Sequence, residues 1–139
     1  DVDKMMLQLR QTAANLGLAL GDRQMTYNSR LAQEVGLWAE TKGRGHQFHM
    51  NAFRAYFSDG RNIADKEVLL DLIGSSGLDA EEGSRVIEDR SFSDAVDQDW
   101  ELSRARGVNA VPTFFMGLEK LVGAQPYEVM EKMVKNQTR

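Results

Sequence analysis

The sequence contains no cysteine among its 139 residues. This absence excludes a disulfide framework and a thiolate metal site, and it leaves no thiol that could act as a nucleophile. It also means that thiol usage gives no information about the cellular compartment. The methionine thioethers are therefore the only sulfur atoms of the chain, and they cannot carry out thiol exchange.

Long apolar runs and an excess of basic residues are absent as well. No segment approaches the roughly 18 apolar residues that a membrane span requires, and the first residues show no charged-then-apolar targeting pattern. There are 17 basic and 21 acidic residues, interleaved to a net charge of -4, which provides no basic stripe for nucleic acid. We therefore expect neither a membrane nor a nucleic-acid partner. Because the chain begins with Asp1 rather than Met, we interpret it as processed, trimmed or deliberately cut.

Apolar residues at helical spacing occupy most of the first hundred positions, with 42% of the chain in the hydrophobic class. Residues 18–27 lack this period and are expected to be extended or turning. The expected helices and their inner residues are 3–16 (Met6, Leu9, Ala13, Leu16), a helix capped by Asn28 (Leu31, Val35, Trp38, Ala39), one ending at Asp59 (Phe48, Ala52, Phe53, Tyr56), one from Asp65 (Val68, Leu69, Leu72, Ile73), one from Asp79 (Val86, Ile87) and 93–106 (Val96, Trp100, Leu102, Ala105). Asp79 with Glu82 also fits the spacing of a reciprocal capping pattern.

The pattern changes near the end of the chain. Residues 113–116 favour a strand, residues 117–119 a turn and residues 120–122 a returning antiparallel strand. Pro126 suits the first turn of a final helix whose apolar side extends to Val134. An isolated hairpin is marginal in water, so the sheet is either incomplete or finished by another chain. The fold class is mainly α, with a strand-strand-helix unit at the end.

The segments 107–115 (GVNAVPTFF) and 122–126 (VGAQP), followed by an amphipathic helix, resemble the ending of the DsbA-type thioredoxin fold, specifically its FrnE-like branch. Residues 53–57 (FRAYF), 60–63 (GRNI) and 68–70 (VLL) resemble the helical insertion of that branch. The turn between the paired strands is about one residue shorter than the Asn-Gly style of turn common in this group. The resemblance implies a helical insertion domain over 1–92 and the carboxy-terminal half of a thioredoxin-like domain over 93–139.

The resemblance also implies a function for the parent protein. Such proteins exchange disulfides through a Cys-x-x-Cys helix that follows the first strand, and neither that helix nor the flanking strands are present here. The chain is thus interpreted as a fragment of a thiol-disulfide oxidoreductase, without catalytic residues and redox-inactive on its own. The implied partners are protein or peptide thiols and disulfides, and the implied location is cytoplasmic.

The resemblance places five residues beside the missing cysteines. Pro112 corresponds to the cis-proline of thioredoxin-like proteins, with Thr113 after it. Val111 would present its backbone to a bound peptide, and Gly123 and Gln125 would border the same site. On residues alone, a trans proline, a turn glycine and a solvent-facing amide explain these positions as well.

Two other groups of residues could suggest a metal site. His46 and His49 are three residues apart on a helix, but nothing nearby completes a ligand set, so we interpret both as surface histidines. Asp97, Asp99 and Glu101 alternate along a helix and point in different directions, which favours a solvated face. The sequence has no Ser-His-Asp order, no phosphate-binding glycine loop and no Cys/His cluster. We therefore expect no metal and no cofactor.

Three hypotheses for the function remain open. The first is the oxidoreductase fragment. The second is a glutathione-dependent relative with the same helical insertion and a serine in place of the cysteine, of the 2-hydroxychromene-2-carboxylate isomerase or kappa-class transferase type. The third is a helical interaction domain without chemistry of its own. In the fold that the resemblance implies, the strand containing Phe114 and Phe115 lacks a neighbour, which would leave its edge and the apolar residues Val129, Met130 and Met133 of the final helix uncovered. We therefore expect a homodimer formed through this sheet; the alternative is a monomer whose helices repack over the hairpin.

Overall fold

The computed structural model describes residues 2–22 and 25–137. Asp1 and residues 23 and 24, which belong to the stretch expected to be extended, lie outside this part. The elements in chain order are α1 (Val2–Asn15), α2 (Arg30–Thr41), α3 (Gly45–Phe53), the π-helical turn η1 (Arg54–Ser58), α4 (Lys66–Ser75), α5 (Ala80–Asp89), α6 (Ser93–Ala105), β1 (Thr113–Met116), β2 (Glu119–Val122) and α7 (Tyr127–Gln137). The mainly α class with a terminal strand-strand-helix unit is confirmed.

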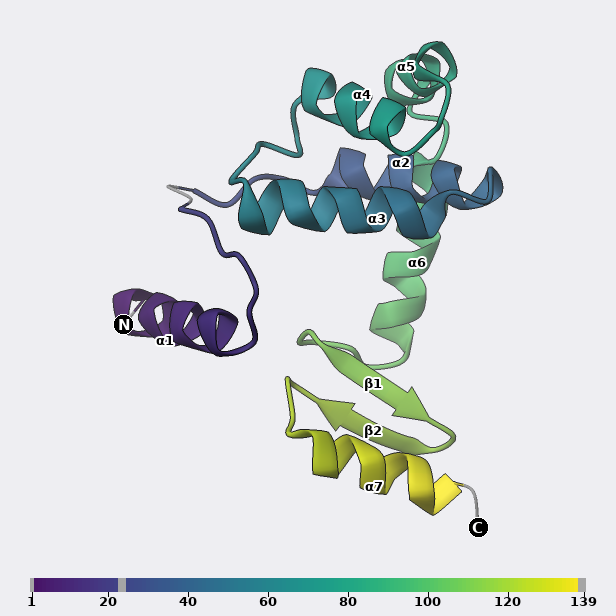
Figure 1. Cartoon of the computed structure of the whole chain (residues 1–139). Helices are drawn as coiled ribbons and strands as arrows, with labels where there is room; N and C mark the ends of the chain where they lie inside the picture. The colour runs from purple at the N-terminus through teal and green to yellow at the C-terminus, as the bar shows by residue number, and fades with distance from the viewer. Residues whose placement is uncertain (1, 23–24, 138–139) are drawn as a thin grey trace. The chain divides into compact units, whose positions relative to one another are not determined.

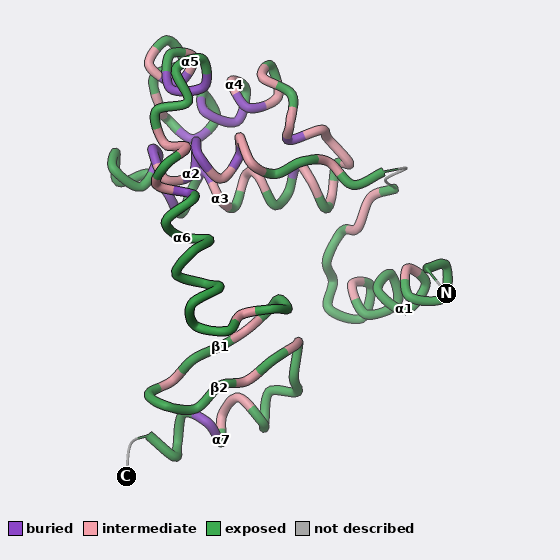
Figure 2. The backbone as a smooth tube through the Cα atoms, turned by 180° about the vertical axis from the view of Figure 1, so that it is seen from behind, coloured by how far each residue is buried: buried purple, intermediate pink, exposed green. Residues whose placement is uncertain are grey.

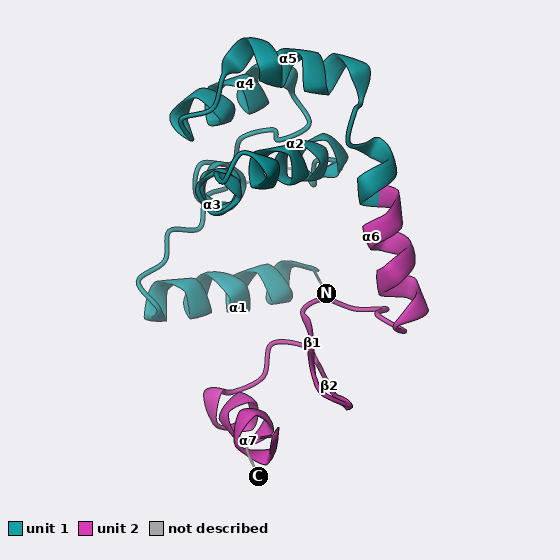
Figure 3. Ribbon diagram, turned by 90° about the vertical axis from the view of Figure 1, so that its right-hand side faces the viewer, with its two compact units in different colours: residues 1–96 teal, residues 97–139 magenta. Residues whose placement is uncertain are grey.

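The chain divides into two compact units, residues 1–96 and residues 97–139, coloured separately in Figure 3. The sequence places a domain boundary at residues 92 and 93, four residues earlier. Its assignment of 1–92 as a helical insertion and 93–139 as half of a thioredoxin-like domain stays a prediction. Among the described residues, no helix is long and apolar enough to cross a lipid bilayer.

The core of the first unit lies between two pairs of helices. α2 packs on α3, α4 packs on α5, and the pairs contact each other through α2 with α5 and α3 with α4. Figure 2 shows the buried segments concentrated in these helices. The fully buried side chains of Val35, Phe48, Leu69 and Ile73 form its centre. Because each lies on an apolar stripe visible in the sequence, hydrophobic periodicity was sufficient to find this core.

Two helices differ from the sequence prediction in what they bury. α1 contains no buried residue, although its apolar stripe predicts its position well. In α6 only Val96 is buried, while Trp100 is 42% and Leu102 51% exposed; Ala105 is exposed as well. The expectation that these faces are covered is therefore wrong for the chain as described. Periodicity predicts which face of a helix is apolar, but the partner that covers it has to come from elsewhere.

The segment after α3 departs from the α-helical period. Here the chain forms the π-helical turn η1, which holds one more residue per turn than an α-helix. The apolar stripe expected over Phe53 and Tyr56 is confirmed only in part, because Tyr56 packs against the core and Ala55 is buried, whereas Phe53 is 56% exposed. Gly21 lies against this turn, where its N–H donates to the Phe57 carbonyl at 2.8 Å. A Cβ at residue 21 would lie 2.2 Å from the carbonyl oxygen of Ser58.

Side-chain caps begin two of the core helices as the sequence predicts. The Asp65 carboxylate accepts from the N–H of Glu67 at 2.8 Å, and that of Asp79 accepts from Glu82 at 2.7 Å. At α2 the prediction was displaced by one residue. Ser29 is the N-cap position, and Asn28 instead accepts a hydrogen bond from the N–H of Arg30 at 2.9 Å.

In the second unit β1 and β2 pair antiparallel, and α7 packs on β1. The register pairs Thr113 with Val122 and Met116 with Glu119, so residues 117 and 118 form a two-residue turn and β2 starts one residue earlier than expected. Gly117 has a φ of 58°. A glycine at the first central position suits the tight turns that join such hairpins. Within the described residues the sheet has two strands.

Candidate functional site

The five residues indicated by the resemblance lie at the end of the hairpin opposite its turn, where β1 begins and β2 ends. The N–H of Gly123 donates to the carbonyl of Pro112 at 2.7 Å, which extends the β1–β2 ladder by one pair beyond Thr113. Gly123 has a φ of 88°, a left-handed conformation that glycine adopts without strain. The residue before β1 and the residue after β2 are thus hydrogen-bonded neighbours.

Two side chains fix the backbone around this point. The Thr113 hydroxyl donates to the Ala110 carbonyl at 2.6 Å, which closes the turn before β1. The Gln125 side-chain amide donates to the Val122 carbonyl at 3.0 Å, which closes the turn after β2. Gln125 is exposed, as a solvent-facing amide would be, but its side chain also constrains the backbone of this turn. Between the two turns, the peptide bond from Val111 to Pro112 is cis, the isomer that the resemblance implies.

Val111 is highly accessible, with 88% of its surface exposed. It lies in the bend before β1, and its apolar side chain faces solvent. Phe114 and Phe115, the next apolar residues of β1, are 37% and 41% exposed. Chemically, this region offers backbone hydrogen-bonding groups and apolar contact surface, and it contains no thiol.

The open edge of β1 follows from the ladder geometry. Hydrogen-bonded and non-hydrogen-bonded pairs alternate along an antiparallel ladder. Since the pair of Pro112 and Gly123 is hydrogen-bonded, Phe114 and Met116 form the next such pairs. The N–H and C=O groups of Thr113 and Phe115 consequently point to the edge away from β2. These are the groups that an additional strand would meet.

Lys120 is bonded to the loop that precedes the site, and the sequence did not indicate this role. Its Nζ donates to the Gly107 carbonyl at 2.5 Å and lies 5.9 Å from the centroid of the Phe115 ring. It therefore connects β2 to the start of the loop that leads into Pro112. A lysine in an exposed strand gives no sequence signal for this role, because the acceptor is a backbone carbonyl 13 residues away.

The metal alternatives gain no support. Within residues 2–22 and 25–137, no three His, Asp or Glu side chains are grouped to hold a metal ion. His46 is exposed, as predicted. His49 also reaches the surface, with its side chain 40% exposed, and its Nε2 lies 3.1 Å from a carboxylate oxygen of Glu40.

Comparisons with known proteins agree on the family. The model of the DSBA-like thioredoxin domain family matches residues 2–135. The crystal structure of probable DsbA oxidoreductase SCO1869 from Streptomyces coelicolor superposes with a TM-score of 0.77 at 29% identity, covering 91% of this chain and 54% of that one.

Two curated relatives come from Bacillus subtilis. The uncharacterized protein YwbO is 29% identical over 110 residues, which is 78% of this chain and 55% of YwbO. The ClpXP adapter protein SpxH is 32% identical over 106 residues, which is 69% of this chain and 35% of SpxH. The chain thus spans about half, or less, of the length of the curated relatives that it matches.

Proposed function

The chain belongs to the DSBA-like thioredoxin domain family, and from this premise we propose that it forms part of a FrnE-like protein thiol-disulfide oxidoreductase whose redox-active cysteines lie outside these 139 residues. Two facts support the proposal. The chain has no cysteine, and it covers 54% of the length of the similar DsbA oxidoreductase structure. Its own role is to provide the walls of the active site.

The observation that carries this proposal is the open β1 edge beside an exposed Val111. Extended peptides bind by adding a strand to such an edge, where backbone groups supply affinity and side-chain contacts supply selectivity. The outward groups of Thr113 and Phe115 would orient a substrate polypeptide, and Val111 would contact it next to its disulfide. A low-pKa cysteine thiolate then attacks one sulfur of the substrate disulfide, the other sulfur leaves as a thiolate, and a second cysteine resolves the mixed disulfide.

The experiment compares insulin reduction, with dithiothreitol as the reductant, by this chain and by the full-length gene product. We expect the chain alone to give no turnover above a buffer control, and the full-length protein to turn over. Replacement of the full-length protein's cysteines by serine is the matched control and should abolish the activity. A full-length protein that contains no cysteine, or one whose activity survives this replacement, would overturn the proposal.

We further propose a cytoplasmic location, on the FrnE-like resemblance.

A non-catalytic interaction role is the second candidate, and one observation favours it. SpxH, which shares 32% identity over 106 residues with this chain, is named an adapter protein. A redox-inactive full-length protein that nevertheless captures a polypeptide through the β1 edge would support this role. The glutathione-dependent alternative predicts instead that activity requires glutathione and a serine, and the same assay with and without glutathione distinguishes it.

For the chain by itself we propose a homodimer. The outward backbone groups of β1 and the half-exposed Phe114, Phe115, Val129 and Val134 would be covered by a second copy of the chain. A two-fold axis beside β1 would pair the same edge of both copies.

A further inference from the structure

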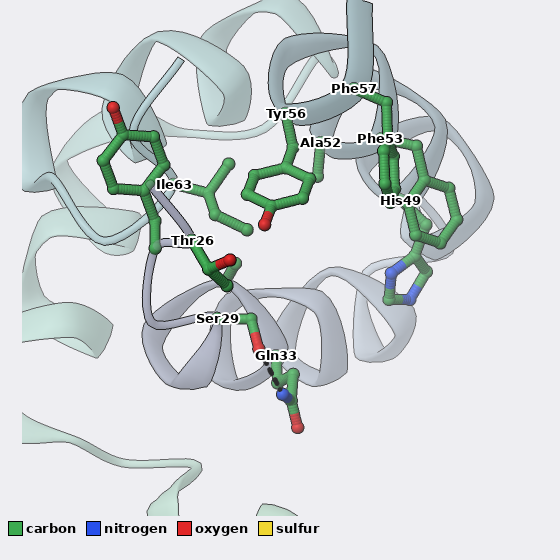
Figure 4. Close-up of a pocket in the computed structure, with 11 residues that line it drawn as sticks. Thr26, Ser29, Gln33, His49, Ala52, Phe53, Tyr56, Phe57 and Ile63 are labelled. Carbon is green, nitrogen blue, oxygen red and sulfur yellow. Dashed lines mark hydrogen bonds between the residues drawn. The ribbon is translucent and has the colours of Figure 1, made fainter. Parts of the chain in front are cut away.

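The first unit contains an apolar cavity of about 410 Å³ that has no role in the function proposed above. It lies between α2, α3, η1 and the residues just before α2, as Figure 4 shows. Aromatic rings make up much of its wall. Tyr56 and Phe57 meet edge to face with centroids 4.8 Å apart, and Tyr27 meets Tyr56 at 6.4 Å. Cavities of this volume with a mostly apolar lining are the usual form of small-ligand sites.

His49 gives the cavity a hydrogen-bond acceptor. Its imidazole lies at one end of the cavity in Figure 4, and its Nε2 is 3.1 Å from Oε1 of Glu40. A carboxylate accepts hydrogen bonds and does not donate them, so Nε2 carries the proton of this pair. In the neutral ring Nδ1 is then an acceptor. Within the described part of the chain no hydrogen bond occupies it.

Two unfavourable local features of the sequence place these groups. Gly36 is buried inside α2, where glycine is a poor helix former, and a Cβ there would lie 2.5 Å from Cε1 of His49. The glycine therefore makes room for the imidazole ring. The second feature is η1, a π-helical turn, which puts Tyr56 and Phe57 on the cavity wall. Such turns are rare and occur often at functional sites.

We propose that this cavity binds a planar aromatic group that carries a hydrogen-bond donor, such as a phenol or an indole. The ring packs against Phe53, Tyr56 and Phe57, for which edge-to-face and offset contacts are favourable. The donor binds Nδ1 of His49. The half-exposed rings of Phe53 and Phe57 become covered when the ligand enters.

The test is a titration of the isotope-labelled chain with p-cresol and with toluene, followed by amide chemical shifts. At about pH 8, p-cresol should shift the amides of residues 49–57. Toluene has the same ring and methyl group but no hydroxyl, and one hydrogen bond predicts about fivefold weaker binding. Equal affinity for the two probes, or shifts that do not include residues 49–57, would overturn the proposal.

Two matched variants test the acceptor. His49→Phe keeps a ring but removes Nδ1, and it should lower the p-cresol affinity to that of toluene while leaving toluene binding unchanged. His46→Phe alters an exposed histidine of the same helix and should change neither affinity. A folded His49→Phe protein that retains the preference for p-cresol contradicts the proposal. If that variant unfolds, the comparison of the two probes on the wild-type chain still decides.

The donor-bearing ring can come from a free molecule or from a tyrosine of a bound polypeptide. A Gly-Gly-Tyr-Gly-Gly peptide, titrated in the same way, distinguishes these sources. Shifts of residues 49–57 with the peptide identify a polypeptide side chain as the ligand. Shifts with p-cresol alone identify a free small molecule, and both outcomes agree with recognition of the ring and its donor.

Discussion

Arg90 forms a two-point ion pair with Glu34, a residue 56 positions away in the sequence and only 1% exposed. Its Nε and Nη2 lie 2.8 and 2.7 Å from the two carboxylate oxygens. Arg30, one turn before Glu34 on α2, donates to the same carboxylate at 2.9 Å and also reaches the Ser93 carbonyl at 2.8 Å. This buried carboxylate thus joins α2 to the end of α5 and the beginning of α6.

Removing the charge of Glu34 should destabilise the first unit. In Glu34→Gln both arginines lose their ionised partner; because the Arg90 side chain is 47% exposed and water screens its charge, we expect a loss of about 1–2 kcal/mol. Urea unfolding followed by circular dichroism measures the change. Glu101→Gln, at an exposed position of α6, is the matched control and should lie within about 0.5 kcal/mol of the wild type. Equal stability of Glu34→Gln and the wild type would show that the ion pair contributes nothing net.

The shifted pKa of Glu34 should make the free energy of unfolding depend on pH. The hydrogen bonds from Arg90 lower the pKa of Glu34 below 4.5, burial opposes them, and Arg30 adds to the lowering. Because the folded pKa is below the unfolded one, the contribution is complete above about pH 4.5 and is lost as the pH falls through the folded pKa. The free energy of unfolding should therefore fall more steeply below pH 4.5 in the wild type than in Glu34→Gln. Parallel acid profiles of the two proteins would contradict this assignment.

The two carboxylate caps should contribute similar amounts. Asp65→Ala and Asp79→Ala each remove the acceptor of a helix-terminal N–H, which costs about 1 kcal/mol. Thermal unfolding measures the loss. Asp99→Ala, in the exposed middle of α6, should not lower the melting temperature, because alanine is the better helix former. If Asp99→Ala lowered the melting temperature as much as the two cap variants do, the loss could not be assigned to the caps.

Self-association of the chain should depend on the backbone of β1. Sedimentation equilibrium at micromolar concentrations should show a monomer and a dimer. Phe115→Pro removes an N–H that points away from β2, so it should abolish the dimer and leave the hairpin intact. Phe115→Ala keeps that N–H and should only weaken the dimer. A single monomer mass for the wild type at all concentrations would refute the dimer.

Much of the fold was predictable because its signals are local. Asp79 with Glu82 specifies the start of α5 within four residues, and the β-favouring residues 113–116 specify β1 directly. The core around Phe48, Leu69 and Ile73 follows from helical periodicity in the same way. Each of these predictions needs information from only one segment of the chain.

The remaining features depend on distant residues or on competing backbone geometry. Glu34 is a glutamate on a predicted helix, and burial is the less common state for a charged side chain. It is buried because Arg90, at a left-handed helix end with a φ of 52°, is in position to pair with it. Likewise, no residue pattern indicates the π-helical turn at Arg54–Ser58, because the same residues fit an α-helix.

The candidate site shows the same division. Its five residues were indicated by resemblance, and the structure brings them together through the bond from Gly123 to Pro112. What they bind stays a prediction. The contact of Lys120 with Gly107 was not foreseen, since an exposed lysine in a strand has many possible partners and only the folded turn selects one.

Gly21 lies in a connecting segment, the kind of region where substitutions are usually tolerated. Its contact with the Ser58 carbonyl leaves no space for even one methyl group. In a saturation mutagenesis screen scored by abundance, position 21 should therefore be depleted of every replacement, as a core position would be. The neighbouring Asp22, which is exposed, should accept most of them. Intolerance to substitution at Gly21 would thus reflect a steric constraint and would not indicate a binding residue.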